Sequence, residues 1–136
     1  MEKIHADAGI NLFLAEDSPL IRVRLAEMFD DDANVAIVGE AETAAAAIEG
    51  ILRERPDVVV LDVQLVDGSG LEVLREIRRV DPDIVFIVFT GYPTPQYRKA
   101  CMEMGAGYFL DKNTEFERVK QIVVELSAGS TGSNEV

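Results

Sequence analysis

Charged side chains follow three of the chain's apolar runs at the point where each run stops. In chain order they are Glu16 with Asp17, then Asp62, then Asp111 with Lys112. Carboxylates gathered in one place repel each other unless a cation lies among them, and Mg²⁺ takes oxygen ligands of this kind. A carboxylate, a divalent ion, a lysine and a hydroxyl are the parts that phosphoryl transfer requires. The pattern therefore predicts a phospho-aspartate.

These residues can meet only if the apolar runs before them are neighbouring strands. Strands are expected at residues 10–15, 35–38, 57–61, 84–89 and 107–110. Helices are expected after Ser18-Pro19, at 43–54, after the turn at 67–70, from Pro95 to near Gly105, and at 114–126. Apolar strands that alternate with helices form a parallel sheet covered on both faces. The fold class is therefore α/β and doubly wound.

In such sheets ligands bind beyond the carboxyl ends of the strands. If the first, third, fourth and fifth strands lie side by side, the polar residues that follow them share one edge of the sheet. These residues are Glu16, Asp17, Asp62, Thr90 and Lys112. We expect them to converge.

Length, charge and composition exclude several classes of protein. The 136 residues suffice for one domain, expected at residues 10–126, with small, polar and flexible ends at 1–9 and 127–136. The net charge of −12 argues against nucleic-acid binding by phosphate neutralisation. The longest apolar run, residues 84–89, is too short to cross a membrane, and a single cysteine cannot form an internal disulfide. We expect a cytoplasmic protein that binds neither nucleic acid directly nor a membrane.

Four fragments, in this order and spacing, resemble the receiver domains of two-component response regulators, including the single-domain chemotaxis type. The fragments are Leu14-Ala15-Glu16-Asp17, Val60-Leu61-Asp62-Val63-Gln64-Leu65, Phe89-Thr90-Gly91 and Gly105-Ala106-Gly107-Tyr108-Phe109-Leu110-Asp111-Lys112. The resemblance spans residues 10 to about 126. It implies a flavodoxin-like (βα)5 sandwich whose five parallel strands have the order 2-1-3-4-5.

The resemblance also implies a role for each site residue. Asp62 would accept the phosphoryl group, Lys112 would bind one phosphoryl oxygen, and Thr90 would bind another. The implied ligands of Mg²⁺ are Glu16, Asp17, Asp62 and the backbone carbonyl of Gln64. Phe109 stands at the switch-aromatic position and would turn inward with Thr90. The fourth helix, fifth strand and fifth helix would then present the signal to a downstream protein.

The phosphoryl group has to come from another protein. The only histidine, His5, lies in the expected N-terminal tail, so the implied donor is a sensor histidine kinase or a histidine phosphotransfer protein. The resemblance is compatible with a monomer or with a dimer that forms on phosphorylation. Many family members have proline where Val66 stands, so we expect a less rigid loop there. The resemblance implies that Gln64 and Tyr92 stand at positions that in the family tune how long the phosphoryl group persists.

Other interpretations stay open. Glu16 and Asp17 alone fit a solvated turn, Lys112 fits a surface lysine, and Phe109 fits a core residue. Residues 68–70 imitate a dinucleotide loop, but Val73 replaces its third glycine, and Asp67 and Ser69 are expected to cap the third helix. The chain could be the receiver half of a longer DNA-binding regulator, or a partner-binding module that is never phosphorylated. A small phosphohydrolase of the haloacid-dehalogenase type would need a carboxylate where Gln64 stands.

Overall fold

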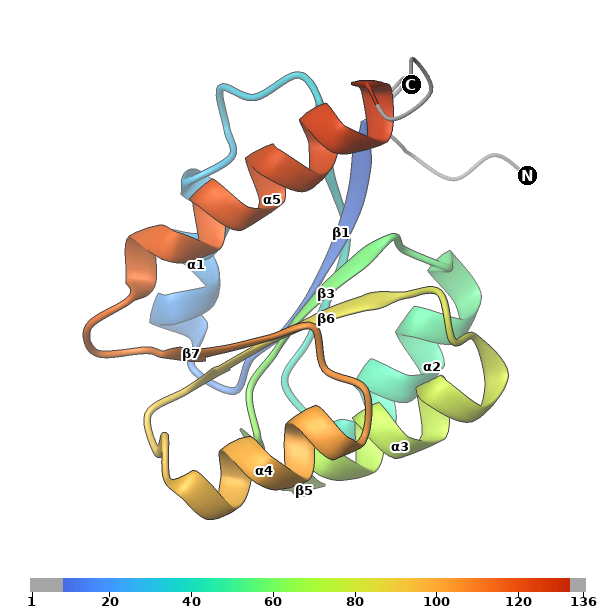
Figure 1. The fold of residues 1–136 in the computed structure, drawn as a ribbon, viewed down its shortest axis with the longest axis vertical. Helices are drawn as coiled ribbons and strands as arrows, with labels where there is room; N and C mark the ends of the chain where they lie inside the picture. Colours follow the sequence, from blue (N-terminus) through green and yellow to red (C-terminus); the bar gives the residue numbers. More distant parts are fainter. Residues whose placement is uncertain (1–8, 133–136) are drawn as a thin grey trace.

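A computed structural model describes residues 9–132, and it has one central parallel sheet (Figure 1). Its five strands lie in the order β2-β1-β3-β6-β7. Their bounds are β1 Ile10–Ala15, β2 Val35–Ala41, β3 Val58–Leu61, β6 Val85–Thr90 and β7 Tyr108–Asp111. The order is the expected 2-1-3-4-5, with β6 and β7 as the fourth and fifth strands of the sheet. The predicted fold class is confirmed.

Five helices connect or follow the strands and begin at local sequence signals. Their bounds are α1 Pro19–Glu27, α2 Ala44–Glu54, α3 Gly70–Val80, α4 Pro95–Glu103 and α5 Phe116–Gly132. The side-chain oxygens of Ser18, Thr43, Ser69 and Thr94 each accept a backbone N–H from the first turn of the helix that follows. These bonds satisfy donors that a helix start otherwise leaves unpaired.

The sheet separates two apolar layers. Helices α2, α3 and α4 cover one face and α1 and α5 cover the other (Figure 1). The first layer includes Phe13, Ile51 and Phe86, and the second includes Leu25 and Phe89. Because strands β1, β3 and β6 are buried on both faces, every residue of β3 is buried, which explains its unbroken apolar sequence. The rigid central strands fix the positions of the loops beyond their ends.

The ring of Phe13 lies where α2 approaches β2, and it depends on two glycines. A Cβ added at Gly39 would lie 2.6 Å from Phe13 Cε2, and one added at Gly50 would lie 2.7 Å from Phe13 Cζ. Both distances are shorter than side-chain contacts allow, so only glycine at both positions admits the ring. Strand β2 continues to Ala41, beyond the expected end at residue 38, because its pairing with β1 resumes after a register shift.

A two-stranded hairpin follows β3, and the sequence pattern did not predict it. Its strands β4 (Gln64–Leu65) and β5 (Gly68–Ser69) pair antiparallel around Val66 and Asp67. The Val66 N–H donates to the Glu42 carbonyl at 3.0 Å, a bond that proline could not form. Ser69 caps α3 as expected, whereas the expectation that Asp67 caps α3 is wrong. The Asp67 carboxylate instead accepts the N–H groups of Ala44 and Ala45, which begin α2.

Helix α5 is longer than predicted. It begins at Phe116 rather than residue 114, and it continues to Gly132, beyond the expected helix end at residue 126. Ser127 is buried, which shows that packing continues beyond the point where the apolar pattern becomes weak. Residues 1–8 and 133–136, which include most of the expected N-terminal end and the last four residues of the expected C-terminal end, lie outside the described residues. Between residues 9 and 132, no helix has the length and apolarity that a membrane span requires.

Candidate functional site

Asp62 lies directly after β3, at the edge of the sheet where the strands end. Its side chain is buried, its N–H donates to the Ala15 carbonyl at 2.9 Å, and its Oδ1 accepts the Gln64 N–H at 3.0 Å. Helix α3 starts against this segment, since a Cβ added at Gly70 would lie only 2.1 Å from the Asp62 carbonyl oxygen. The backbone on both sides of Asp62 is therefore tightly held.

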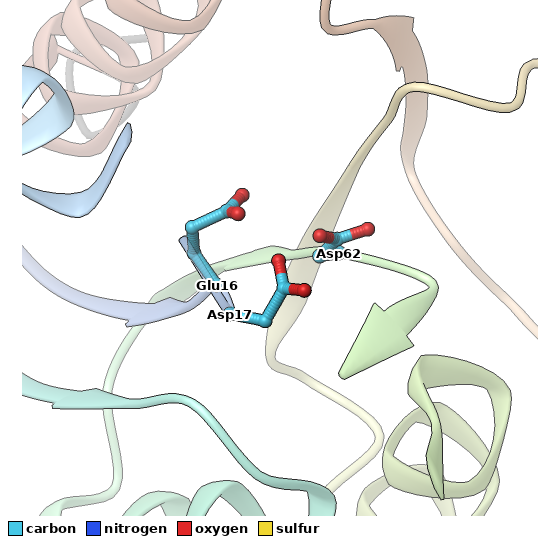
Figure 2. Close-up of side chains that lie close together, drawn as sticks. All are labelled: Glu16, Asp17 and Asp62. Atoms are coloured by element: carbon cyan, nitrogen blue, oxygen red, sulfur yellow. The ribbon is translucent and has the colours of Figure 1, made fainter. Parts of the chain in front are cut away.

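Glu16 and Asp17 follow the neighbouring strand β1. Glu16 is 1% exposed, and its Oε2 accepts the Ser18 N–H at 3.0 Å. One carboxylate oxygen from each of Glu16, Asp17 and Asp62 lies within 4.8 Å of the others. Figure 2 shows the three side chains gathered beyond the ends of β1 and β3. The predicted convergence of the acidic residues is confirmed.

Lys112 provides the positive charge beside these carboxylates. Its Nζ lies 2.9 Å from Asp62 Oδ2, 2.9 Å from Glu16 Oε1 and 3.1 Å from Glu16 Oε2. The buried Glu16 Oε1 nevertheless lacks a partner in hydrogen-bonding geometry. One ammonium group thus contacts two of the three clustered carboxylates. The arrangement is consistent with a divalent-metal site.

Burial dominates the electrostatics of the cluster. It raises the pKa of Glu16 from 4.5 to about 7, although hydrogen bonds from Lys112 and Ser18 oppose the change. Burial also raises the pKa of Asp62, against hydrogen bonds from Gln64 and Lys112. It acts to lower the pKa of Lys112, but the hydrogen bonds to Asp62 and Glu16 outweigh it, so that pKa is raised. A bound cation would favour the ionised carboxylates.

Thr90 is hydrogen-bonded to the backbone of Lys112, whereas Phe109 lies in the core. Thr90 ends β6, is fully buried, and accepts the Tyr92 N–H on Oγ1 at 3.0 Å. Its carbonyl accepts the Lys112 N–H at 2.8 Å. Phe109 packs in the core layer on the α4 side, with the Arg98 guanidinium carbon 5.7 Å from its ring centroid. Gln64 contributes its N–H to Asp62, while its side chain is exposed.

Two contributors to the site were missed by the sequence reasoning. Arg22 of α1 donates from Nη1 to the Glu16 carbonyl at 2.7 Å, and the β4–β5 hairpin holds Gln64 beside Asp62. Two partners of the Arg22 side chain, Glu40 and Glu42, lie at the end of β2, so no local pattern identifies Arg22. The hairpin has a two-residue turn, Val66 and Asp67, which is a typical hairpin length, but this sequence signal is weak.

Comparison with known proteins identifies the family. Residues 12–124 match the response regulator receiver domain. This chain belongs to that family. The receiver is 30% identical over 120 residues to the DNA-binding transcriptional activator DevR/DosR of Mycobacterium tuberculosis, with 88% of this chain and 55% of that protein covered. It is 28% identical over 120 residues to the response regulator GacA of Pseudomonas aeruginosa, with 88% and 56% covered. The receiver spans about half the length of these relatives.

Solved structures agree with the fold of the receiver. A LuxR-family two-component response regulator from Aurantimonas superposes with a TM-score of 0.80 at 26% identity, with 89% of this chain and 86% of that chain covered. A chain of the CheX–CheY–BeF3–Mg complex of Borrelia burgdorferi superposes with a TM-score of 0.77 at 23% identity, with 85% and 87% covered. The latter likeness shows the fold alone. Family membership and the acidic cluster together give this receiver domain a phosphoacceptor role in signalling.

Proposed function

We propose that this receiver accepts a phosphoryl group on Asp62 from a phosphohistidine of a sensor kinase or phosphotransfer protein. One observation carries the proposal: a buried aspartate at the open edge of the sheet contacts a lysine and shares its surroundings with two further carboxylates. A carboxylate oxygen of Asp62 would attack phosphorus, the bond from phosphorus to the histidine nitrogen would break, and the imidazole would keep the electron pair. The product is an acyl phosphate on Asp62.

The chain's own groups support this step in distinct ways. The Gln64 N–H orients the Asp62 carboxylate by donating to Oδ1, and Lys112 places a positive charge beside Oδ2. That charge is available to the phosphoryl oxygens as they approach. Burial excludes water from the carboxylate, which strengthens each of these interactions. Thr90 Oγ1 accepts the Tyr92 N–H, so its own O–H would be the group that donates to a further phosphoryl oxygen.

The donor set fits Mg²⁺. Glu16, Asp17 and Asp62 would hold the ion together with the backbone carbonyl of Gln64. The buried Glu16 Oε1 lies 2.9 Å from Lys112 Nζ without hydrogen-bonding geometry, and it gives an oxygen for the ion or for one of its waters. When bound, Mg²⁺ supplies positive charge to the carboxylates and to the transferred group. A hard divalent ion suits three carboxylates better than a soft metal does, since the cluster contains neither thiolate nor imidazole.

We also propose how the modified state is read. Movement of Thr90 toward the phosphoryl group would leave space beside β6, and Phe109 on the adjacent strand β7 would adjust its ring in response. The surface formed by α4, β7 and α5 would carry that change to a protein partner, as a monomer or as a dimer formed on phosphorylation. From family membership we place the protein in the cytoplasm.

A second candidate function is control of a DNA-binding domain joined to the receiver. DevR/DosR is named a DNA-binding transcriptional activator, and the receiver covers 55% of it. The receiver would then control a DNA-binding part of a longer protein, and its own surface would not contact DNA. The phosphohydrolase alternative is weaker, because Gln64 places an amide where such an enzyme needs a general acid.

The test is phosphorylation of the purified chain with acetyl phosphate and Mg²⁺, followed by intact-protein mass spectrometry. Wild type should gain one phosphoryl group, and Asp62→Asn should gain none. Asp83→Asn is the matched control, because Asp83 is exposed and precedes β6 at the opposite end of the sheet. A wild type that gains no phosphoryl group, or an Asp62→Asn variant that gains it equally, would contradict the proposal. Generic phosphate-ester hydrolysis would favour the phosphohydrolase instead.

A further inference from the structure

The Arg22 side chain contacts two segments beside the three clustered carboxylates. It lies one turn into α1, and its side chain is 19% exposed. Nη1 donates to the Glu16 carbonyl at 2.7 Å and lies 3.4 Å from Glu42 Oε1, while Nε lies 3.5 Å from Glu40 Oε1. One guanidinium group thus connects the loop after β1 with the end of β2. The rigid, planar fork of N–H donors on a guanidinium suits acceptors held in fixed positions around it.

The residues that follow β2, which Arg22 contacts through Glu42, also hold the loop after β3. The Glu42 carbonyl accepts the Val66 N–H, and the Asp67 carboxylate accepts the first N–H groups of α2. Val66 and Asp67 form the turn of the hairpin that contains Gln64. The contacts therefore run from Glu16 through Arg22 and Glu42 to the hairpin. Both loops that carry the proposed metal ligands are joined through the end of β2.

We propose that Arg22 is a positioning residue for the divalent-metal site. It holds the backbone of Glu16 and braces the β2 end against which the Gln64 hairpin is fixed. The inference rests on the proposed function, because it assigns Arg22 a role toward the metal that Glu16, Asp17 and Asp62 would bind. Arg22 acts through these groups and contacts neither the metal nor the phosphoryl group.

A purely electrostatic role and a positioning role for Arg22 predict opposite changes in Mg²⁺ affinity when Arg22 is replaced. Removing a positive charge near a cation site strengthens cation binding, because the repulsion between the two positive charges is lost. Removing a positioning group weakens cation binding, typically about tenfold or more when the group orients a ligand. The direction of the change in Mg²⁺ affinity therefore separates positioning from simple charge. A merely structural role would lower stability and leave that affinity unchanged.

The experiment is calorimetric titration of the unphosphorylated chain with Mg²⁺ for wild type, Arg22→Met, Arg22→Lys and Arg24→Met. Arg24 is the matched control: it is an exposed arginine on the same helix, stacked on Phe116 and not in contact with the acid cluster. We expect about tenfold weaker Mg²⁺ binding for Arg22→Met and a smaller loss for Arg22→Lys. Arg24→Met should bind like wild type. Amide NMR shifts of Asp17 and Ser18 should move in the two Arg22 variants only.

Phosphorylation by acetyl phosphate gives a second readout. The Arg22 variants should need more Mg²⁺ for the half-maximal rate, while their rate at saturating Mg²⁺ should approach that of wild type. Unchanged or tighter Mg²⁺ binding in Arg22→Met, or an equal loss in Arg24→Met, overturns the inference. If Arg22→Met does not fold, Arg22→Lys decides, and wild-type affinity in that variant overturns the inference. A wild type that is phosphorylated on Asp62 leaves the proposed function standing in these cases, whereas a wild type that binds no Mg²⁺ overturns both.

Discussion

The substitution Glu16→Gln should stabilise the metal-free protein above neutral pH. Glutamine keeps the shape of the side chain and can still accept the Ser18 N–H, but it removes a negative charge that is 1% exposed. Burial raises the pKa of Glu16 from 4.5 to about 7. That difference corresponds to a penalty of about 3 kcal/mol for holding the ionised carboxylate in the folded state, which we take as an upper limit.

The pH dependence follows from where the proton is bound. Below pH 4.5 Glu16 is protonated in both the folded and the unfolded chain, so it contributes no penalty. Between pH 4.5 and about 7 the folded chain retains a proton that the unfolded chain has lost, so stability falls as pH rises. Above pH 7 the penalty is complete. The advantage of Glu16→Gln over wild type should therefore grow from near zero at pH 4 to at most about 3 kcal/mol at pH 8.

Urea unfolding at several pH values, with a chelator present, measures this advantage. Asp62 titrates in both proteins, and because its charge interacts with that of Glu16, the difference between wild type and variant reports Glu16 together with its effect on Asp62. The exposed Glu125, replaced by glutamine, gives a control whose advantage should not vary with pH in this way. Added Mg²⁺ should stabilise wild type more than Glu16→Gln, because ligand binding to the folded state adds stability. An advantage that is constant from pH 4 to pH 8, or that declines, would refute the reasoning.

Three further substitutions test other parts of the site. Lys112→Met leaves the buried Asp62 and Glu16 without their ammonium, so unfolding free energy at pH 8 without metal should fall by about 3 kcal/mol, measured in urea. Gly70→Ala places a Cβ 2.1 Å from the Asp62 carbonyl oxygen and should cost about 1–3 kcal/mol while slowing phosphorylation by acetyl phosphate. Thr90→Ala removes the hydroxyl but none of the carboxylates, so Mg²⁺ affinity should persist while phosphorylation no longer changes the NMR signals of the Phe109 ring.

Each of these has a distinct contrary outcome. Unchanged stability of Lys112→Met would mean that the carboxylates do not rely on the ammonium. For Gly70→Ala the control is Gly91→Ala, since a Cβ at Gly91 meets nothing within 4 Å, and equal losses in the two variants would show that glycine flexibility matters more than the close approach. If phosphorylation still changes the NMR signals of the Phe109 ring in Thr90→Ala, the movement of that ring does not depend on the Thr90 hydroxyl.

The strands and the convergence of the acidic residues were predictable because both depend on local pattern and on one general rule. A buried parallel strand such as β3 needs apolar residues at every position, and parallel strands place their carboxyl ends at one edge. Helix starts were also local, since Ser18 and Thr94 bind N–H groups only three residues away. The roles of Thr90 and Phe109 rest on the resemblance to receivers rather than on pattern.

The features that were missed depend on residues far apart in the chain. Asp67 caps the start of α2, 23 residues earlier, although its neighbour Ser69 caps the adjacent helix as expected. Arg22 finds Glu42 20 residues away. Helix α5 continues past residue 126 through the buried Ser127, although the sequence there has weak helix propensity. These contacts form only when the chain packs in three dimensions, so they cannot be read from local sequence patterns.

The edge position of β7 has a consequence for the order in which the site forms. Lys112 reaches Asp62 across 50 residues and Glu16 across 96 residues of chain. During synthesis from the N-terminus, both acidic segments emerge well before the strand that carries the lysine. A nascent chain that ends before β7 therefore contains the carboxylates without their ammonium, and it has to keep them apart, protonated or bound to a cation. Docking of the last strand is thus the folding step that completes the charge balance of the whole site.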